Sequence, residues 1–144
     1  MESIKKGLLN TSWRASPITA ELVTQLFVTG KAETILENKR EEVRKRNDLA
    51  IKILSGYDVV NKPCGFFQWL LLPSKWQGRE FELSLREAGV QVLCAEKFVV
   101  GSNRALSAVR ISLSGSNTIE ELEKGLNILK KLLQKGYENQ IIIL

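Results

Sequence analysis

The chain has 144 residues, of which 44% are hydrophobic and 26% are charged, a composition typical of one globular domain with a single core. It contains no histidine and only two cysteines, which excludes Ser-His and Cys-His nucleophile pairs within the chain and any zinc site with a histidine ligand. The net charge of +5, from 21 basic and 16 acidic residues, permits an anionic partner without requiring one.

The sequence contains no signal for a membrane span or for secretion. No apolar run reaches the roughly 18 residues that a spanning helix needs, and the N-terminal MESIKKGLLNTSWR lacks the apolar segment of a signal peptide. We therefore expect a cytoplasmic location and no membrane partner. In that compartment Cys64 and Cys94 are predicted to be buried structural thiols rather than a disulfide or redox sensors.

Two helices are predicted in the N-terminal third. Ser16-Pro17 is a typical helix start, and Gly30 closes a segment whose apolar residues recur at helical spacing, namely Ile18, Leu22, Val23, Leu26 and Phe27. A longer helix is predicted from about Ala32 to Leu54, with Gly56 after its end.

The long helix carries the densest group of charges, but the signs are mixed. Glu41 lies four residues before Lys45, and Glu42 lies four residues before Arg46, which are favourable spacings for ion pairs along a helix. We interpret this segment as a solvated helix face rather than as a stripe that binds phosphates.

The middle of the chain changes to the period of a β-strand. Val59-Val60 and the run from Phe66 to Leu72 are rich in β-branched or aromatic residues and are bounded by Pro and Gly. Both faces of the second run are largely apolar, which predicts a central strand and places Trp69 in the core. A helix is then predicted from Gln77 to Ala88.

The C-terminal half completes the sheet and adds a last helix. A short strand is predicted around Val90 and Val92, with an irregular exit near Phe98, and another strand from Leu106 to Leu113. Thr118-Ile-Glu-Glu121 is a capping box that begins a helix, whose buried stripe is Leu122, Leu126, Leu129, Leu132 and Leu133 and whose end is predicted at Gly136.

These elements predict an α+β fold. The expected architecture is a small, mostly antiparallel sheet of three to four strands, covered on one face by helices and preceded by two helices.

Arg110 is the one charged residue in the strand from Leu106 to Leu113. Val109, Ile111 and Leu113 share one face of that strand, whereas Ala108, Arg110 and Ser112 share the other. This alternation is what any half-exposed strand shows and by itself favours an ordinary exposed arginine; the alternative is an arginine that faces a cleft and binds a carboxylate through its planar fork of donors. The pattern alone leaves both interpretations open.

Four segments in order resemble the C-terminal small domain of fold-type I pyridoxal-phosphate aminotransferases. They are a serine-proline helix start followed by a long arginine-rich helix, Gly65-Phe66-Phe67-Gln68-Trp69, the stretch from Gly89 to Phe98 in place of the pattern GVxVxPGxxF, and Arg110-Ile111-Ser112 in place of RLS. The subtype most similar is the MocR/GntR group, which are transcriptional regulators with an aminotransferase-like C-terminal half. The resemblance covers about residues 16–133.

The resemblance implies a division of the chain and a set of binding residues. Residues 1–35 would be a helical segment from the end of a missing large domain, and residues 36–144 would be the small domain. Arg110 would bind the α-carboxylate of the substrate, and Gly65, Phe66, Cys94 and Ala95 are candidates to line the cleft. Cys94-Ala95 replaces the Pro-Gly of the family pattern, which fixes a tight bend at the mouth of the site, so the loop geometry and the catalytic competence are expected to depart from those of the family.

The resemblance also implies the cofactor and partners of a longer parent protein. Pyridoxal phosphate would be bound only in the full-length parent, by the large domain, so that no catalytic residue is expected in this chain and the chain alone would be inactive. The partners would be that large domain and an amino-acid or other carboxylate ligand. A regulator would contact DNA only through a separate N-terminal domain, and the parent would be a homodimer.

Two alternatives remain from the sequence. The first is a non-catalytic module that senses an effector carboxylate through Arg110. The second is a basic α+β domain that binds nucleic acid, motivated only by the net charge; the mixed-sign helix and the lack of an aromatic RNA-binding motif argue against it.

Overall fold

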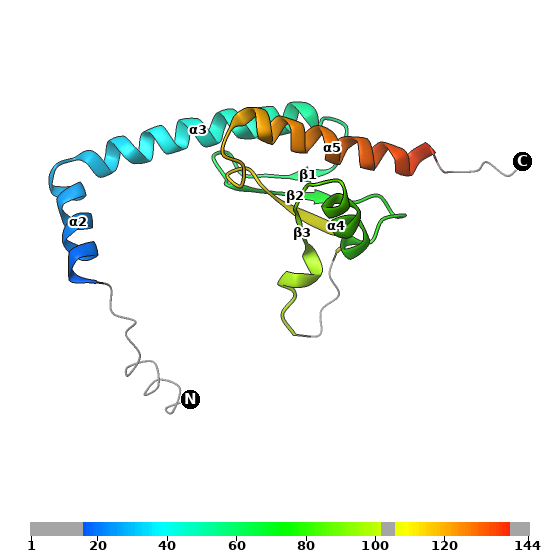
Figure 1. Cartoon of the computed structure of the whole chain (residues 1–144), viewed down its shortest axis with the longest axis horizontal. Helices are drawn as coiled ribbons and strands as arrows, with labels where there is room; N and C mark the ends of the chain where they lie inside the picture. The colour runs from blue at the N-terminus through cyan, green and yellow to red at the C-terminus, as the bar shows by residue number, and fades with distance from the viewer. Residues whose placement is uncertain (1–15, 102–105, 139–144) are drawn as a thin grey trace, which may run out of the picture. The chain divides into compact units, whose positions relative to one another are not determined.

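The computed structural model describes residues 16–101 and 106–138 (Figure 1). The chain divides into two compact units, Met1–Lys39 and Arg40–Leu144. The first unit contains α2 (Pro17–Val28) and the beginning of α3 (Lys31–Ile53), and the second contains the rest of α3 and every strand. The assignment of residues 1–35 to the end of a larger domain stays a prediction.

The two N-terminal helices begin and end close to the predicted positions. Pro17 occupies the first turn of α2, although the Ser16 side chain makes no capping hydrogen bond. Gly30 adopts a φ of +72°, a left-handed conformation that glycine tolerates and that separates α2 from α3. The apolar residues of α2 are not buried, and Ile18 is 79% exposed.

Four short strands form one antiparallel sheet in the order β1-β2-β4-β3. They are β1 (Val59–Val60), β2 (Phe67–Leu71), β3 (Leu93–Cys94) and β4 (Ala108–Ser112). The prediction that the Phe66–Leu72 run is a central strand is confirmed, because β2 pairs with β1 on one side and with β4 on the other. The strand predicted around Val90 and Val92 lies slightly later in the chain, since β3 contains neither valine, has two residues and leads directly into the 3-10 helix η1 (Ala95–Phe98).

Helices cover one face of this sheet, as the predicted α+β architecture has it. In Figure 1 α5 (Ile119–Glu138) and the C-terminal part of α3 run above the strands, and α4 (Gly78–Glu87) packs near β3. The core between these layers is aliphatic with one aromatic ring; its buried residues include Ala50, Leu54, Leu70, Phe81, Leu85, Val109, Ile111, Leu113, Leu126, Leu129 and Leu133. The predicted α+β fold is therefore confirmed.

Arg46 corrects the prediction of an entirely solvated charged face on α3. The predicted pair between Arg46 and Glu42 forms at 3.0 Å, but Arg46 is only 5% exposed. Its guanidinium donates to the carbonyl oxygens of Leu113 at 2.8 Å and Ser116 at 3.0 Å, so a buried cation fastens the loop between β4 and α5 to α3. The pair between Lys45 and Glu41 lies on the surface as predicted.

The last helix begins as predicted and ends later. The backbone N–H of Glu121 donates to Thr118 Oγ1 at 3.2 Å, and the Glu121 carboxylate accepts from the N–H of Asn117 rather than from that of Thr118. The prediction that Gly136 ends α5 is wrong, because the helix continues through it to Glu138. A glycine inside a helix costs only about 1 kcal/mol relative to alanine, so it is a weak stop signal unless the backbone turns left-handed there.

In the part of the chain that the structure describes, no helix has both the length and the apolar composition that crossing a bilayer requires.

Candidate functional site

The sheet face opposite the helices carries the predicted binding arginine. Cross-strand partners point to the same face, and β2 and β4 pair Trp69 with Arg110 and Phe67 with Ser112. Leu93 of β3 and Val60 of β1 join them by the same rule. We call this surface the open face; by the same pairing it comprises Val60, Phe67, Trp69, Leu71, Leu93, Ala108, Arg110 and Ser112.

Two phenylalanine rings hold the Arg110 guanidinium on the open face. Its central carbon lies 4.3 Å from the centroid of the Phe67 ring and 4.5 Å from that of the Phe98 ring. Phe98 in turn meets Trp69 edge to face, with ring centroids 5.4 Å apart. A cation over an aromatic face gains roughly 0.5–2 kcal/mol, depending on how far it is desolvated. The side chain is therefore oriented by its neighbours although it lies at the surface.

Arg110 has no carboxylate partner among residues 16–101 and 106–138. Ion pairs within these ranges include Lys45–Glu41, Arg46–Glu42 and Lys97–Glu82, and Arg110 belongs to none of them. A guanidinium carries five N–H donors in its plane, and no hydrogen bond joins those of Arg110 to the residues that the structure describes. Arg110 thus presents a positive group with donors that the described residues do not neutralise.

An apolar hollow lies beside Arg110 on the same face. This hollow, which we call the open-face groove, has a volume of about 310 Å³. Its lining residues come from three strands and from the segment after β3; they are Val60, Trp69, Leu71, Ala95, Phe98, Val99, Leu106 and Ala108. Phe98 belongs both to the groove and to the ring pair that holds Arg110.

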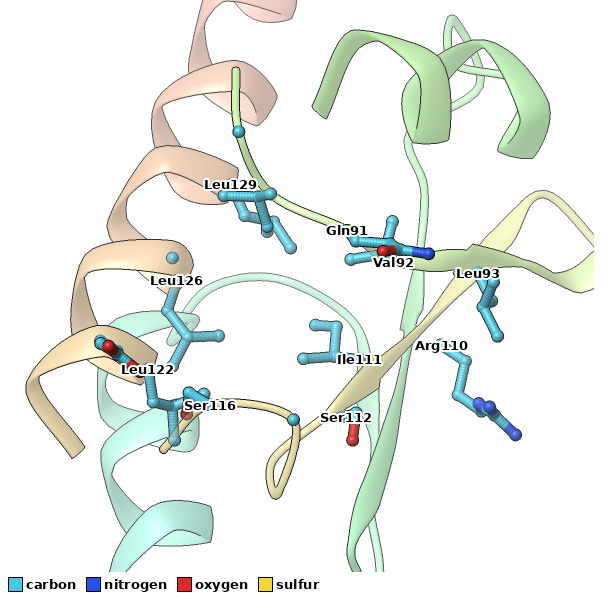
Figure 2. Close-up of a pocket in the computed structure, with 15 residues that line it drawn as sticks. Gln91, Val92, Leu93, Arg110, Ile111, Ser112, Ser116, Leu122, Leu126 and Leu129 are labelled. Atoms are coloured by element: carbon cyan, nitrogen blue, oxygen red, sulfur yellow. The ribbon is translucent and has the colours of Figure 1, made fainter. Parts of the chain in front are cut away.

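A second hollow, which we call the edge pocket, lies between the β3–β4 edge and α5. Its volume is about 450 Å³ (Figure 2). Figure 2 shows the side chains of Ile111, Leu122 and Leu126 converging there, whereas the guanidinium of Arg110 points away from it. Its polar lining includes Gln91, Ser112, Ser116 and Glu121. Arg110 borders this pocket because of its position on β4, but its guanidinium lies on the open face of the sheet.

The structure brings only some of the candidate cleft residues together. Ala95 lines the open-face groove next to the ring that holds Arg110. Cys94 points to the helix-covered side and is 2% exposed, and Gly65 and Phe66 line neither hollow. The Gly65 carbonyl instead accepts a hydrogen bond from Asn47 on α3 at 2.8 Å. The binding roles of all five candidates, Arg110 included, stay predictions.

Trp69 corrects an expectation about the core. The sequence places it in the interior, but it lies half-buried on the open face and lines the groove. Both faces of β2 are apolar because one packs under helices and the other lines an apolar hollow, and composition does not distinguish these two surroundings.

A buried carboxylate holds the bend between β3 and η1, where the family pattern has Pro-Gly. Glu82 of α4 is 7% exposed; it accepts the backbone N–H of Cys94 at 2.9 Å and pairs with the Lys97 ammonium. Burial raises the pKa of Glu82, but the hydrogen bonds from Cys94 and Lys97 outweigh it and lower that pKa to about 2. We call these contacts the Glu82 clamp. They join α4 to Cys94 and to Lys97 of η1, the segment that ends at Phe98.

Cys94 is the buried structural thiol that the sequence predicts. Burial raises its pKa to about 11, and the nearby Glu82 and Glu96 side chains act in the same direction. The thiol therefore stays protonated near neutral pH and is a poor nucleophile. Cys64 is a free thiol too, but it is only half-buried.

The sequence pattern did not reveal the ring pair around Arg110 or the Glu82 clamp. Phe98 and Lys97 lie in a 3-10 turn of four residues, which is too short to show a periodic pattern of apolar residues. Glu82 looks in the sequence like any polar residue of an amphipathic helix. The only signal for Phe98 was the aromatic residue that ends the family pattern. No group of three His, Cys, Asp or Glu side chains able to hold a metal ion occurs in the two described ranges.

Similarity to known proteins agrees with this geometry. The chain is 43% identical over 132 residues to an uncharacterized HTH-type transcriptional regulator, YdeF, of Bacillus subtilis; the match covers 92% of the chain and 29% of the length of that regulator. No protein-family model matches the sequence.

Solved structures of aminotransferases share the fold. An archaeal alanine:glyoxylate aminotransferase matches 69% of the chain and 24% of its own, with a TM-score of 0.54 and 25% identity. The multiple substrate aminotransferase of Thermococcus profundus matches 84% of the chain and 30% of its own, with a TM-score of 0.66 and 17% identity, which shows the fold alone.

The antiparallel sheet with its arginine-bearing strand and its layer of helices thus has the fold of an aminotransferase-like small domain, and the chain is similar in sequence to part of an HTH-type transcriptional regulator.

Proposed function

We propose that the chain is the carboxylate-binding part of an aminotransferase-like transcriptional regulator of the MocR/GntR group, with Arg110 as the binding residue. The observation that carries the proposal is the guanidinium on the open face, oriented by Phe67 and Phe98 and without a carboxylate partner among the described residues. The regulator that is 43% identical supports the regulatory assignment.

The geometry suits recognition of a carboxylate in particular. A guanidinium can donate two parallel N–H···O bonds to the two oxygens of one carboxylate, which gives direction as well as charge. The rings that pack against Arg110 reduce the rotamer freedom that would otherwise be lost on binding. An amino acid or a related organic acid therefore fits the site.

Pyridoxal phosphate belongs in this proposal to the parent protein and not to this chain alone. The cofactor needs a lysine for its aldehyde and donors for its phosphate, and neither the open-face groove nor the edge pocket is lined by a lysine. When bound to the remaining part of the parent, the cofactor would act as an electron sink for reactions at the α-carbon of an amino acid. This chain would contribute the carboxylate contact and one wall of the site.

A non-catalytic, effector-sensing role is the second candidate, and the regulator relative favours it. In that case Arg110 binds the carboxylate of an effector, and the parent reports occupancy to DNA through a separate N-terminal domain. Both versions place a large domain next to this chain in a cytoplasmic, homodimeric parent. They differ in whether the parent converts the amino acid, so turnover by the full-length protein separates them.

Nuclear magnetic resonance on the whole 144-residue chain tests the binding role directly. Propionate and L-alanine are titrated while the side-chain Nε–Hε signal of Arg110 and the amides of β4 are followed. We expect saturable shifts at these signals with dissociation constants on the order of millimolar, because one ion pair supplies most of the affinity. Propionamide, which lacks the charge, should produce no such shifts.

Substitutions provide the matched controls for that titration. Arg110→Gln should abolish the saturable shifts, whereas Arg86→Gln, which changes an exposed arginine at the end of α4, should leave them intact. Equal shifts in Arg110→Gln and in the unmodified chain would refute the proposal, because the carboxylate would then be bound elsewhere.

A further inference from the structure

We infer that the ligand whose carboxylate meets Arg110 carries an aromatic or bulky aliphatic group, and that this group lies in the open-face groove. The inference rests on the proposed function, since it extends the same site from the head of the ligand to its tail. It assigns a ligand class in which the tail is apolar and uncharged, so that small acids bind more weakly and acids with a charged tail are disfavoured.

The first argument is the position of Phe98, which joins the two parts of the site. Its ring lies 4.5 Å from the central carbon of the Arg110 guanidinium and 5.4 Å from the Trp69 ring. Phe98 and Trp69 also line the groove, so the wall of the groove is in contact with the cation. Ala108 precedes Arg110 by two residues on the same face of β4 and lines the groove as well. A ligand bound to the edge of the guanidinium thus needs a spacer of only a few bonds to reach the groove.

The second argument is the chemistry of the lining. None of the groove residues carries a charge, and the indole of Trp69 is the only side chain among them with a polar atom. A charged or strongly polar tail would lose its hydration there without gaining a partner, whereas an apolar tail gains from leaving water. The volume of about 310 Å³ lies at the lower end of small-ligand sites and suits a single ring or a branched chain.

The third argument is the contrast with the edge pocket. That pocket is larger, but Glu121 and the hydroxyl groups of Ser112 and Ser116 line it, and the Arg110 guanidinium points away from it. A ligand held by Arg110 would have to turn back around the edge of the sheet to place its tail there. The cation and the open-face groove form a charged head site and an apolar tail site on one surface.

A pair of carboxylates that differ only in the tail tests the inference on the whole chain. Propionate and 3-phenylpropionate are titrated by the same resonance method at one pH and salt concentration. We expect 3-phenylpropionate to bind about tenfold or more tightly, with shifts at Ala108, Phe98 and the Trp69 indole, because one buried ring contributes at least that factor. 3-Phenylpropanamide, which keeps the ring but lacks the charge, should bind much more weakly than the acid.

Val99 and Val100 provide a matched pair of variants. Val99 lines the groove and is 36% exposed, whereas its neighbour Val100 is 85% exposed and does not line it. Val99→Ser should reduce the ratio of the affinity for 3-phenylpropionate to that for propionate, and Val100→Ser should leave this ratio unchanged. Both residues follow η1 at the surface, so neither change should prevent folding.

The outcomes separate the two proposals. If both acids bind with equal affinity and both depend on Arg110, the tail assignment is overturned and the carboxylate site stands. If neither acid produces shifts that Arg110→Gln removes, the proposed function itself is refuted. If the amide binds as tightly as the acid, the groove binds apolar molecules independently of Arg110, and the inference fails.

A second copy of the chain is another possible occupant of the groove, and sedimentation velocity tests it. The inference expects no self-association that depends on Val99 between about 10 and 200 µM. A dimer that Val99→Ser dissociates would show that the groove is an interface, which would overturn the inference. A dimer that Val99→Ser leaves unchanged would use another surface. The ratio of the affinities for 3-phenylpropionate and propionate would then still decide whether the groove binds the tail of the ligand.

Discussion

Glu82 and Arg46 are charged side chains that the fold buries, and each fastens a segment next to the sheet to a helix. Arg46 donates to carbonyl oxygens of the loop after β4, and Glu82 accepts the N–H of Cys94 at the end of β3. Removing one partner of such a group leaves the other buried without compensation, which costs more than the contact itself contributes. Polar groups thus set the course of the two segments on either side of the Arg110 strand.

Substituting Glu82 should produce a stability change that depends on pH. The folded-state pKa is lowered from 4.5 to about 2, so the charged clamp stabilises the fold fully above the unfolded-state value and loses this contribution as pH falls toward 2. We expect Glu82→Gln to lower the free energy of unfolding by roughly 2–3 kcal/mol at pH 7, and the difference from the unmodified chain to shrink below pH 4.5. Urea unfolding at pH 7, 4.5, 3 and 2.5 measures this.

Glu87→Gln is the control for that experiment, because Glu87 is exposed at the end of the same helix. Its effect should stay within about 0.5 kcal/mol at every pH, as is usual for surface substitutions. A constant penalty for Glu82→Gln from pH 7 to 2.5 would mean that shape and not charge holds the β3–η1 bend, contrary to the expectation.

Among the elements, α5 contains a glycine that its helix does not need. A Cβ built on Gly125 meets no atom within 4 Å, because the residue borders the edge pocket. Gly125→Ala should therefore stabilise the chain by about 0.5–1 kcal/mol, through the helix propensity of alanine and a less flexible unfolded state. Thermal unfolding followed by circular dichroism should show a corresponding rise in Tm.

Gly89 is the matched comparison, since a Cβ there also meets no atom within 4 Å. Its φ of +83° lies in the left-handed region, where alanine is strained by roughly 1–2 kcal/mol. Gly89→Ala should consequently lower Tm although it creates no clash. A shift of Tm in the same direction for both variants would contradict the expectation that the left-handed backbone at Gly89 determines the sign of its effect.

The elements also show how far the sequence could predict the fold. The period of two in β4 separated Val109 and Ile111 from Arg110 correctly, because burial on one face selects apolar residues at alternate positions. The same reasoning could not identify what lies over the opposite face, which depends on the irregular segment that carries Phe98. It also missed the burial of Arg46, because a helix period reports apolar residues and not which cation a loop will cover.

The candidate site was predicted less completely than the fold for a related reason. The position of Arg110 followed from a local pattern and a family resemblance, whereas the open-face groove combines residues from β1, β2, β4 and the chain after β3. Such a hollow depends on register and on the exit from β3, and both are set by long-range pairs such as Trp69 with Arg110 and Leu93 with Arg110.

At the scale of the whole molecule, the stability of the chain should differ between its two units. Helix α2 has twelve residues and buries none of them, whereas the second unit contains the common core of the sheet and α5. An isolated helix of this length is marginal in water, since tertiary packing supplies most helical stability in proteins. The apolar stripe of α2 is exposed and therefore available to another surface.

Amide hydrogen exchange on the whole chain measures this difference. At low micromolar concentration we expect the amides of α2 to exchange within about tenfold of unstructured rates, and those of β4 and the middle of α5 to be protected up to the global free energy of unfolding. Repeating the measurement at a twentyfold higher concentration distinguishes two causes of any protection in α2. Protection that increases with concentration means that another copy covers the apolar stripe of Ile18, Leu22 and Phe27. Strong protection that is independent of concentration would contradict the expectation, because α2 would then be packed within a single chain.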